Sequence, residues 1–188
     1  IGDNIPSDKC ILANATGLAQ YALLCQRNHL VPIVEPEVLM DGTHTVDTSF
    51  DVTSRTLDVV FHQLEEHQVD LRGIVLKPNM VLSGYNCKHQ ASVEEVAQRT
   101  LECLTTNVPS DVPGIAFLSG GQSDEDATLH LNEMNKSETN WNLTFSYGRA
   151  LQQPALKAWA GKEENAQATQ DRLLQRTEAN SLATTASL

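Results

Sequence analysis

Four short apolar segments, each followed by a segment with helical spacing of its apolar residues, constrain the fold of this chain most strongly. They cover residues 30–37, 73–80, 115–121 and 143–149, and each begins apolar and ends in polar or glycine residues. Runs of Val, Ile and Leu are typical of strands buried on both faces of a parallel sheet. The alternation therefore predicts α/β structure built from βα units, whose strands all end at the same edge of the sheet.

The helical segments between these strands are bounded by polar and glycine residues. Residues 41–49 form a polar loop, and Ser92 to Glu95 fits a capping box at the start of a helix. Gly161 is expected to interrupt the last helical region, which continues to about Asn180, and residues 181–188 are expected to form a frayed tail. Helices are predicted over residues 8–29, 52–67 and 123–134. Two further helical regions are predicted to begin at residue 92 and at about residue 149.

Four strands do not close a barrel. An eight-stranded (β/α) barrel usually takes about 250 residues, whereas this chain has 188 residues. An open half-barrel leaves two unpaired edges, which favour aggregation. The chain is therefore expected to be part of a longer protein, or to pair its edges with another copy.

Composition excludes several classes of partner. The formal net charge of −11 argues against binding to nucleic acid or to anionic membranes, and no apolar run approaches the roughly 18 residues of a membrane span. Four cysteines are scattered without a C-x-x-C pair, which predicts reduced thiols and a cytoplasmic protein. The six histidines lack the spacing of a zinc site, so we expect no metal and no cofactor.

Lys77 follows an apolar strand directly and precedes Pro78, which cannot extend a sheet. A buried ammonium group is costly, so a lysine in such a position tends to lose its proton and act as a nucleophilic amine. This chemistry is typical of imine-forming enzymes. The alternative is an ordinary lysine at the end of a strand with its ammonium group in solvent.

Glu35 and Glu37 end the first strand and are two residues apart, so they point to one side if the chain remains extended through Pro36. Two carboxylates at one site can keep one of them protonated for acid–base chemistry. The alternative is a pair of solvated loop residues. Glycosidases also use two carboxylates, but from separate elements that face each other across the scissile bond.

Two glycine-containing segments follow the last two strands. Ser119, Gly120 and Gly121 precede a helix, and glycines there let an anion approach the backbone N–H groups closely. Ser146 and Gly148 repeat this pattern, and Arg149 adds a guanidinium group. The two segments predict a phosphate site, with tight turns as the alternative, and neither has the G-K-[ST] ending of a P-loop. A lysine nucleophile, an acid pair and a phosphate site together predict a Schiff-base aldolase acting on a sugar phosphate.

Four motifs in the same order resemble class I fructose-bisphosphate aldolase: VPIVEPE (31–37), LKPNM (76–80), FLSGGQS (117–123) and FSYGRAL (145–151). The shorter motifs EDAT (125–128) and AWAGK (158–162) also resemble this family, and the resemblance extends from Ile1 to about Leu182. It implies the C-terminal half of a (β/α)8 TIM barrel, with about four βα units present over residues 1–188.

The resemblance also implies the roles of individual residues. Lys77 would form the Schiff base, Glu35 would transfer protons, and Glu37 would assist the imine chemistry. The substrate phosphate would be held by Ser119, Gly120, Gly121, Ser146, Gly148 and Arg149. The family is metal-free and usually homotetrameric, and it cleaves fructose 1,6-bisphosphate reversibly to dihydroxyacetone phosphate and glyceraldehyde 3-phosphate in glycolysis and gluconeogenesis.

Two departures from the family pattern affect the expected activity. The chain begins where the family's fourth strand ends, so that the first four strands, with their catalytic aspartate and lysines, are absent, and the terminal tyrosine is absent too. We therefore expect this chain to be inactive alone. Two other interpretations stay open: another Schiff-base enzyme such as deoxyribose-phosphate aldolase or transaldolase, and a non-catalytic scaffold protein derived from an aldolase.

Overall fold

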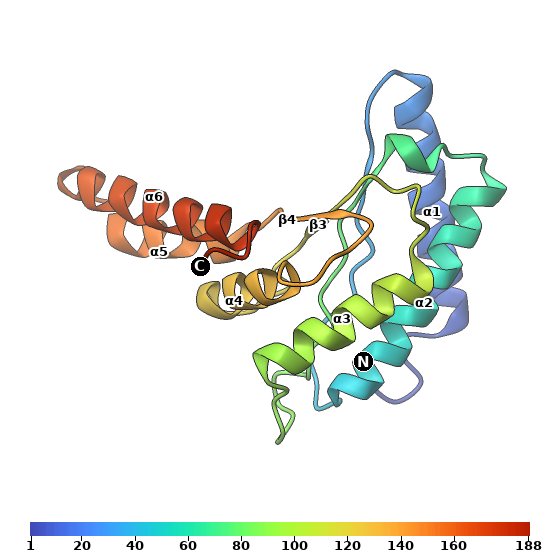
Figure 1. The fold of residues 1–188 in the computed structure, drawn as a ribbon, viewed down its shortest axis with the longest axis horizontal. Helices are drawn as coiled ribbons and strands as arrows, with labels where there is room; N and C mark the ends of the chain where they lie inside the picture. Colours follow the sequence, from blue (N-terminus) through green and yellow to red (C-terminus); the bar gives the residue numbers. More distant parts are fainter.

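The computed structural model describes all residues from Ile1 to Leu188 and contains a sheet, six α-helices and two short 3-10 helices (Figure 1). In chain order the elements are α1 (Asp8–Arg27), β1 (Ile33–Val34), α2 (Val46–Glu66), η1 (Leu71–Gly73), β2 (Val75–Leu76), α3 (Val93–Asn107), β3 (Gly114–Phe117), α4 (Asp124–Met134), β4 (Asn142–Phe145), α5 (Arg149–Trp159), η2 (Glu163–Asn165) and α6 (Ala166–Ala183).

The four strands form one parallel sheet in the order β1-β2-β3-β4. The pairing is longest between β3 and β4, whose register runs from Gly114 opposite Asn142 to Phe117 opposite Phe145. The helices are arranged as an arch around the strands, with α1 and α2 at one end and α5 and α6 at the other (Figure 1). The predicted α/β class with four successive βα units is therefore confirmed.

The hydrophobic core lies between the strands and the helices. Val34, Leu76, Ile115 and Phe117 are completely buried, one or two from each of the first three strands. They belong to one cluster with buried side chains of the helices, such as Leu57 of α2. Each βα unit therefore contributes to a common core, as the continuous apolar strands predict.

The helix boundaries follow from side-chain capping. The hydroxyl groups of Ser7, Thr45, Ser92 and Ser123 each accept a hydrogen bond from a backbone N–H of the next helix. The second helix was predicted to start at about residue 52, and this was wrong: α2 starts at Val46, because Thr45 caps it. The predicted strands were also too long, since β1 and β2 have two residues each.

The C-terminal region has two helices separated by a turn. Ala160 and Gly161 have positive φ angles of 52° and 73°, and α5 ends just before them, as predicted. The expected tail at residues 181–188 needs correction, because α6 continues to Ala183, which is fully buried. The following residues turn back, and the N–H of Leu188 donates a hydrogen bond to Asn132 Oδ1 at 3.1 Å.

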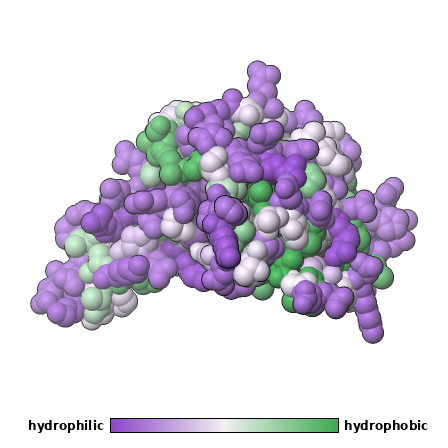
Figure 2. Space-filling model, turned by 90° about the horizontal axis from the view of Figure 1, so that it is seen from below, coloured by the Kyte–Doolittle hydropathy of each residue, from purple (hydrophilic) through white to green (hydrophobic).

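The surface is mostly hydrophilic, with hydrophobic groups exposed in separate patches (Figure 2). Around β1, the large apolar side chains of Leu30, Val31, Ile33 and Leu39 are exposed. All four cysteines are free, as predicted from their spacing. None of the helices combines the length and apolar character that crossing a bilayer requires.

Candidate active site

Lys77 lies directly after β2, with its side chain paired to the residue that follows β1. Its Nζ is 3.0 Å from Glu35 Oε1. The backbone N–H of Lys77 donates to Val34 O at 2.8 Å, which fixes the two strand ends relative to each other. The Lys77 side chain is only 19% exposed, whereas that of Glu35 is 44% exposed. Lys77 is thus largely sheltered and its charge is paired, which differs from a lysine with its ammonium group free in solvent.

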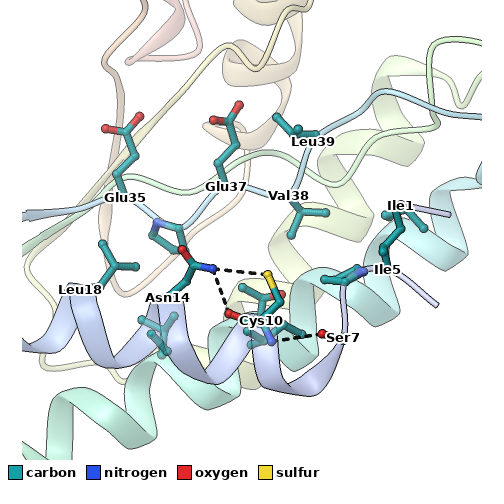
Figure 3. A pocket seen from close by; sticks show the side chains of 16 residues that line it. Ile1, Ile5, Ser7, Cys10, Asn14, Leu18, Glu35, Glu37, Val38 and Leu39 are labelled. Carbon is teal, nitrogen blue, oxygen red and sulfur yellow. Dashed lines mark hydrogen bonds between the residues drawn. The ribbon is translucent and has the colours of Figure 1, made fainter. Parts of the chain in front are cut away.

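Glu35 and Glu37 point in the same direction, away from α1, in the view of Figure 3. Pro36 between them is buried, so the chain alternates as an extended strand does, although β1 itself ends at Val34. A cavity of about 410 Å³ lies between the first half of α1 and this segment. Glu35 and Glu37 are among the residues that line this largely apolar cavity, but their carboxylate groups point away from its α1 side (Figure 3).

The segment Ser119–Gly121 forms a turn whose two glycines are half-buried. Gly120 and Gly121 have φ angles of +57° and +87°, which favour glycine. Their backbone N–H groups donate to no backbone carbonyl, and Ser119 is buried just before them. Successive N–H groups in such a turn form a concave site that suits an anion.

The second glycine segment lies beside the first. Ser146 N–H donates to Phe117 O at 2.9 Å, which joins the ends of β4 and β3. Gly148 precedes α5 without any side-chain cap, so the first N–H groups of this helix are open to an anion. Arg149 Nη2 lies 3.6 Å from the position that a Cβ atom on Gly121 would occupy. The structure therefore brings the guanidinium group to the glycine turn.

The lysine and the glycine turn belong to neighbouring strand ends. Leu118 N–H donates to Pro78 O at 3.1 Å, so the residue after Lys77 is bonded to the residue before Ser119. Together with the Lys77–Val34 and Ser146–Phe117 bonds, this gives one continuous edge. All nine residues that were predicted from the sequence follow the strands at this edge.

Tyr85 is a site residue that the sequence analysis missed. Its hydroxyl group donates to Gly120 O at 3.5 Å and would lie 2.0 Å from a Cβ atom on Gly121. Burial raises the pKa of Tyr85, although the neighbouring Arg149 acts in the opposite direction. No motif points to Tyr85, because it reaches the glycine turn from the loop after β2, which only the folded chain brings there.

Comparison with known proteins identifies the family. A family model described as fructose-bisphosphate aldolase class-I matches residues 1–188. The chain belongs to the class I fructose-bisphosphate aldolase family. The chain is 56% identical over 161 residues to a probable class 1 aldolase of Xanthomonas axonopodis pv. citri, covering 85% of this chain and 48% of that protein. It is 53% identical over 186 residues to the cytoplasmic aldolase isozyme of Spinacia oleracea, covering 98% of this chain and 52% of that protein.

The fold of the aldolase family is shared as well. A solved structure of fructose-bisphosphate aldolase from Plasmodium falciparum, in a ternary complex with TRAP and a small-molecule inhibitor, matches with a TM-score of 0.94 and 49% identity. The match covers 97% of this chain and 53% of that aldolase chain. This chain thus spans about half the length of the aldolases it matches, and its four βα units fit part of a TIM barrel.

Proposed function

We propose that Lys77 is the Schiff-base nucleophile of a fructose 1,6-bisphosphate aldolase, in which this chain supplies the nucleophile, the acid pair and one phosphate site. The observation that carries the proposal is the 3.0 Å pair of Lys77 Nζ and Glu35 Oε1 at the edge where Gly121 and Arg149 also lie. A nucleophile within hydrogen-bonding distance of a proton-transfer group is the arrangement that covalent catalysis requires.

In the first step, the Lys77 ammonium group transfers a proton to the Glu35 carboxylate, and the neutral amine adds to the C2 ketone of the open-chain sugar phosphate. The carbinolamine that forms loses its hydroxyl group as water, and Glu35 supplies the proton for this step. The product is an iminium ion, which carries a positive charge next to the carboxylates. Glu37 lies on the same side of the chain and is proposed to assist this proton transfer.

In the second step, the iminium ion accepts the electron pair of the C3–C4 bond. The C4 hydroxyl group loses its proton and becomes the aldehyde of glyceraldehyde 3-phosphate, while an enamine remains on Lys77. Protonation of the enamine at C3 and hydrolysis of the imine then release dihydroxyacetone phosphate. The reverse sequence joins the two triose phosphates.

The phosphate next to the ketone is proposed to bind to the two glycine segments. The N–H groups of Gly120, Gly121 and Gly148 and the hydroxyl groups of Ser119 and Ser146 provide donors, and Arg149 provides charge. Because catalysis depends on the position of the ketone relative to the nucleophile, this phosphate site would hold C2 near Lys77.

Borohydride trapping tests the proposal. Treatment of the whole protein with dihydroxyacetone phosphate and borohydride is expected to reduce the imine and leave a stable adduct on Lys77, detected by mass spectrometry of peptides. Lys77→Met is expected to abolish the adduct. Lys157→Met, which removes an exposed lysine of α5, is expected to retain it. An adduct that persists in Lys77→Met, or none in the wild-type whole protein, contradicts the assignment and favours a scaffold role.

The cellular context is proposed from the relatives. Aldolases of spinach and Arabidopsis thaliana that match this chain are named cytoplasmic and cytosolic, so we propose a cytoplasmic glycolytic protein that also serves gluconeogenesis. The whole protein is proposed to be a homotetramer. Size-exclusion chromatography with light scattering of the whole protein tests this assignment.

A further inference from the structure

A second cavity, of about 400 Å³, lies between the loop after β2 and the first turns of α4. Its apolar wall includes Met40, Leu82 and Val96, while Asp126 and His130 of α4 contribute acceptor groups. None of the nine residues proposed for catalysis or phosphate binding lines this cavity. Tyr85 and Gln122 do line it, so the cavity adjoins the glycine turn.

His130 is the most informative residue of this cavity, because it is 94% buried (6% exposed) and only one of its ring nitrogens is used. Its Nδ1 is 2.7 Å from Gln122 Oε1, and Gln122 Nε2 is directed to Met80 Sδ at 3.6 Å. An amide oxygen only accepts hydrogen bonds, so Nδ1 carries the proton and Nε2 is left as an acceptor. No protein group bonds to Nε2.

The charge state of His130 agrees with this role. Burial lowers the pKa of His130, although the nearby Asp126 acts in the opposite direction. The imidazole is therefore neutral at pH 7, and its Nε2 lone pair is free. No protein donor occupies this position, and Nε2 is not enclosed by the protein, so a ligand that brings a donor can bond there.

The other polar groups around the cavity define the ligand further. Asp126 is exposed and lies one turn before His130, so the two acceptors are on the same side of α4. The hydroxyl of Ser123 and the amide of Gln90 already have protein partners. No lysine or arginine lines the cavity. A ligand must therefore bring donors, and the carboxylate favours a cation over an anion.

We propose that this cavity binds a small organic amine, with an apolar body against the Met40, Leu82 and Val96 wall and an ammonium group that donates to His130 Nε2 and to the Asp126 carboxylate. The ligand class follows from the free acceptors, the negative charge and the apolar wall together. This site goes beyond the proposed aldolase chemistry and does not depend on it.

Three probes with the same ring test the proposal by nuclear magnetic resonance of the whole chain: benzylamine, which is a cation at pH 7, benzyl alcohol and benzoate. Benzylamine is expected to give saturable shifts of the His130 ring nitrogens and of the Met40 methyl group, because both residues line the cavity. Benzyl alcohol is expected to bind at least about fivefold more weakly, because one charge-assisted bond of about 1 kcal/mol is lost. Equal binding of benzoate and benzylamine, or no saturable shift at His130, would overturn the proposal.

Two substitutions on α4 that each remove one negative charge provide a matched pair of variants. Asp126→Asn is expected to weaken benzylamine binding about fivefold, and it keeps the fold because Asp126 is exposed. Glu125→Gln removes an exposed carboxylate that does not line the cavity, and is expected to leave the affinity unchanged. Equal effects of the two substitutions would mean that the amine responds only to the acidic surface, which contradicts a defined site.

Discussion

Gly121 is constrained both by its backbone conformation and by the side chains that surround it in the candidate site. Its φ angle of +87° is one that residues with a Cβ rarely adopt, and a Cβ atom there would meet the Tyr85 hydroxyl at 2.0 Å. Tyr85 is an exposed side chain that can move, but it would then lose its bond to Gly120 O. Glycine at this position therefore serves both the turn and its neighbours.

Gly121→Ala is expected to destabilise the chain by about 1–2 kcal/mol through the positive φ angle, and to lower the yield of trapped imine. Gly17→Ala is a suitable control, because Gly17 lies in α1 with nothing within 4 Å of its Cβ position. Alanine there is expected to stabilise the chain by roughly 0.5–1 kcal/mol. Urea denaturation measures both changes, and the same sign for both would contradict the explanation.

The buried hydroxyl group of Tyr147 is expected to make the free energy of unfolding depend on pH in the alkaline range. Its hydroxyl group donates to Ala127 O at 2.8 Å inside the protein, and burial raises the pKa of Tyr147 above its usual value of 10.0. Above about pH 10 the unfolded chain loses this proton first, so the free energy of unfolding falls as the pH rises. The stabilisation is therefore fully present below pH 10.

Tyr147→Phe is expected to cost about 1 kcal/mol at pH 7, where a buried hydrogen bond is lost. Above pH 10 the free energy of unfolding of this variant is expected to fall less steeply than that of the wild-type chain. Chemical denaturation between pH 8 and 11, at about half-unit steps, measures the two slopes. Parallel slopes would show that another group controls the alkaline transition.

At the scale of elements, α6 is held to α4 mainly by polar contacts. Only Asn180 and Ala183 of α6 are buried. Thr128 Oγ1 of α4 donates to Asn180 Oδ1 at 3.0 Å, and Asn180 Nδ2 donates to Arg176 O at 2.8 Å. Arg176 also bonds to Asp124 O and to Thr128 Oγ1. The packing of this helix therefore depends on a few hydrogen bonds.

Asn180→Ala is expected to destabilise the protein by about 1–3 kcal/mol, because it leaves buried groups unpaired. Hydrogen exchange of the α6 amides is expected to accelerate more than that of α2. Glu178→Ala, at an exposed position of the same helix, is expected to change stability by less than about 0.5 kcal/mol. Uniform acceleration in all helices would instead indicate that α6 opens only when the whole chain unfolds.

The boundaries of the elements also show what the sequence could and could not predict. The alternation of apolar strands with helical segments located every strand and every α-helix. It missed the first six residues of α2, because the start of this helix depends on one hydroxyl group of Thr45. Strand motifs located Lys77 and Arg149, but Tyr85 lies in a loop without a pattern, and its place beside Gly121 results from folding.

At the scale of the whole molecule, the sheet has two unpaired edges, at β1 and β4. The β1 edge is the more apolar one, since Val31 and Ile33 are 67% and 47% exposed, whereas Asn142 and Thr144 are exposed on β4. An exposed apolar edge pairs readily with another chain, and a lysine placed on it opposes pairing.

Ile33→Lys is therefore expected to reduce self-association of the chain at concentrations of about 10–100 μM, measured by sedimentation velocity. Thr144→Lys adds the same charge at the polar β4 edge and is expected to have a smaller effect. Should Thr144→Lys have the larger effect, association would proceed through β4 instead of β1.

The pair of Lys77 and Glu35 joins two βα units that are separated along the chain by the whole of α2. Neither unit alone contains both the amine and the carboxylate. Reactivity towards a ketone should consequently return, after dilution from denaturant, only when the two units have docked. The rate at which a refolding sample regains borohydride-trappable imine would then time that docking event, while far-ultraviolet circular dichroism would record the earlier growth of helix.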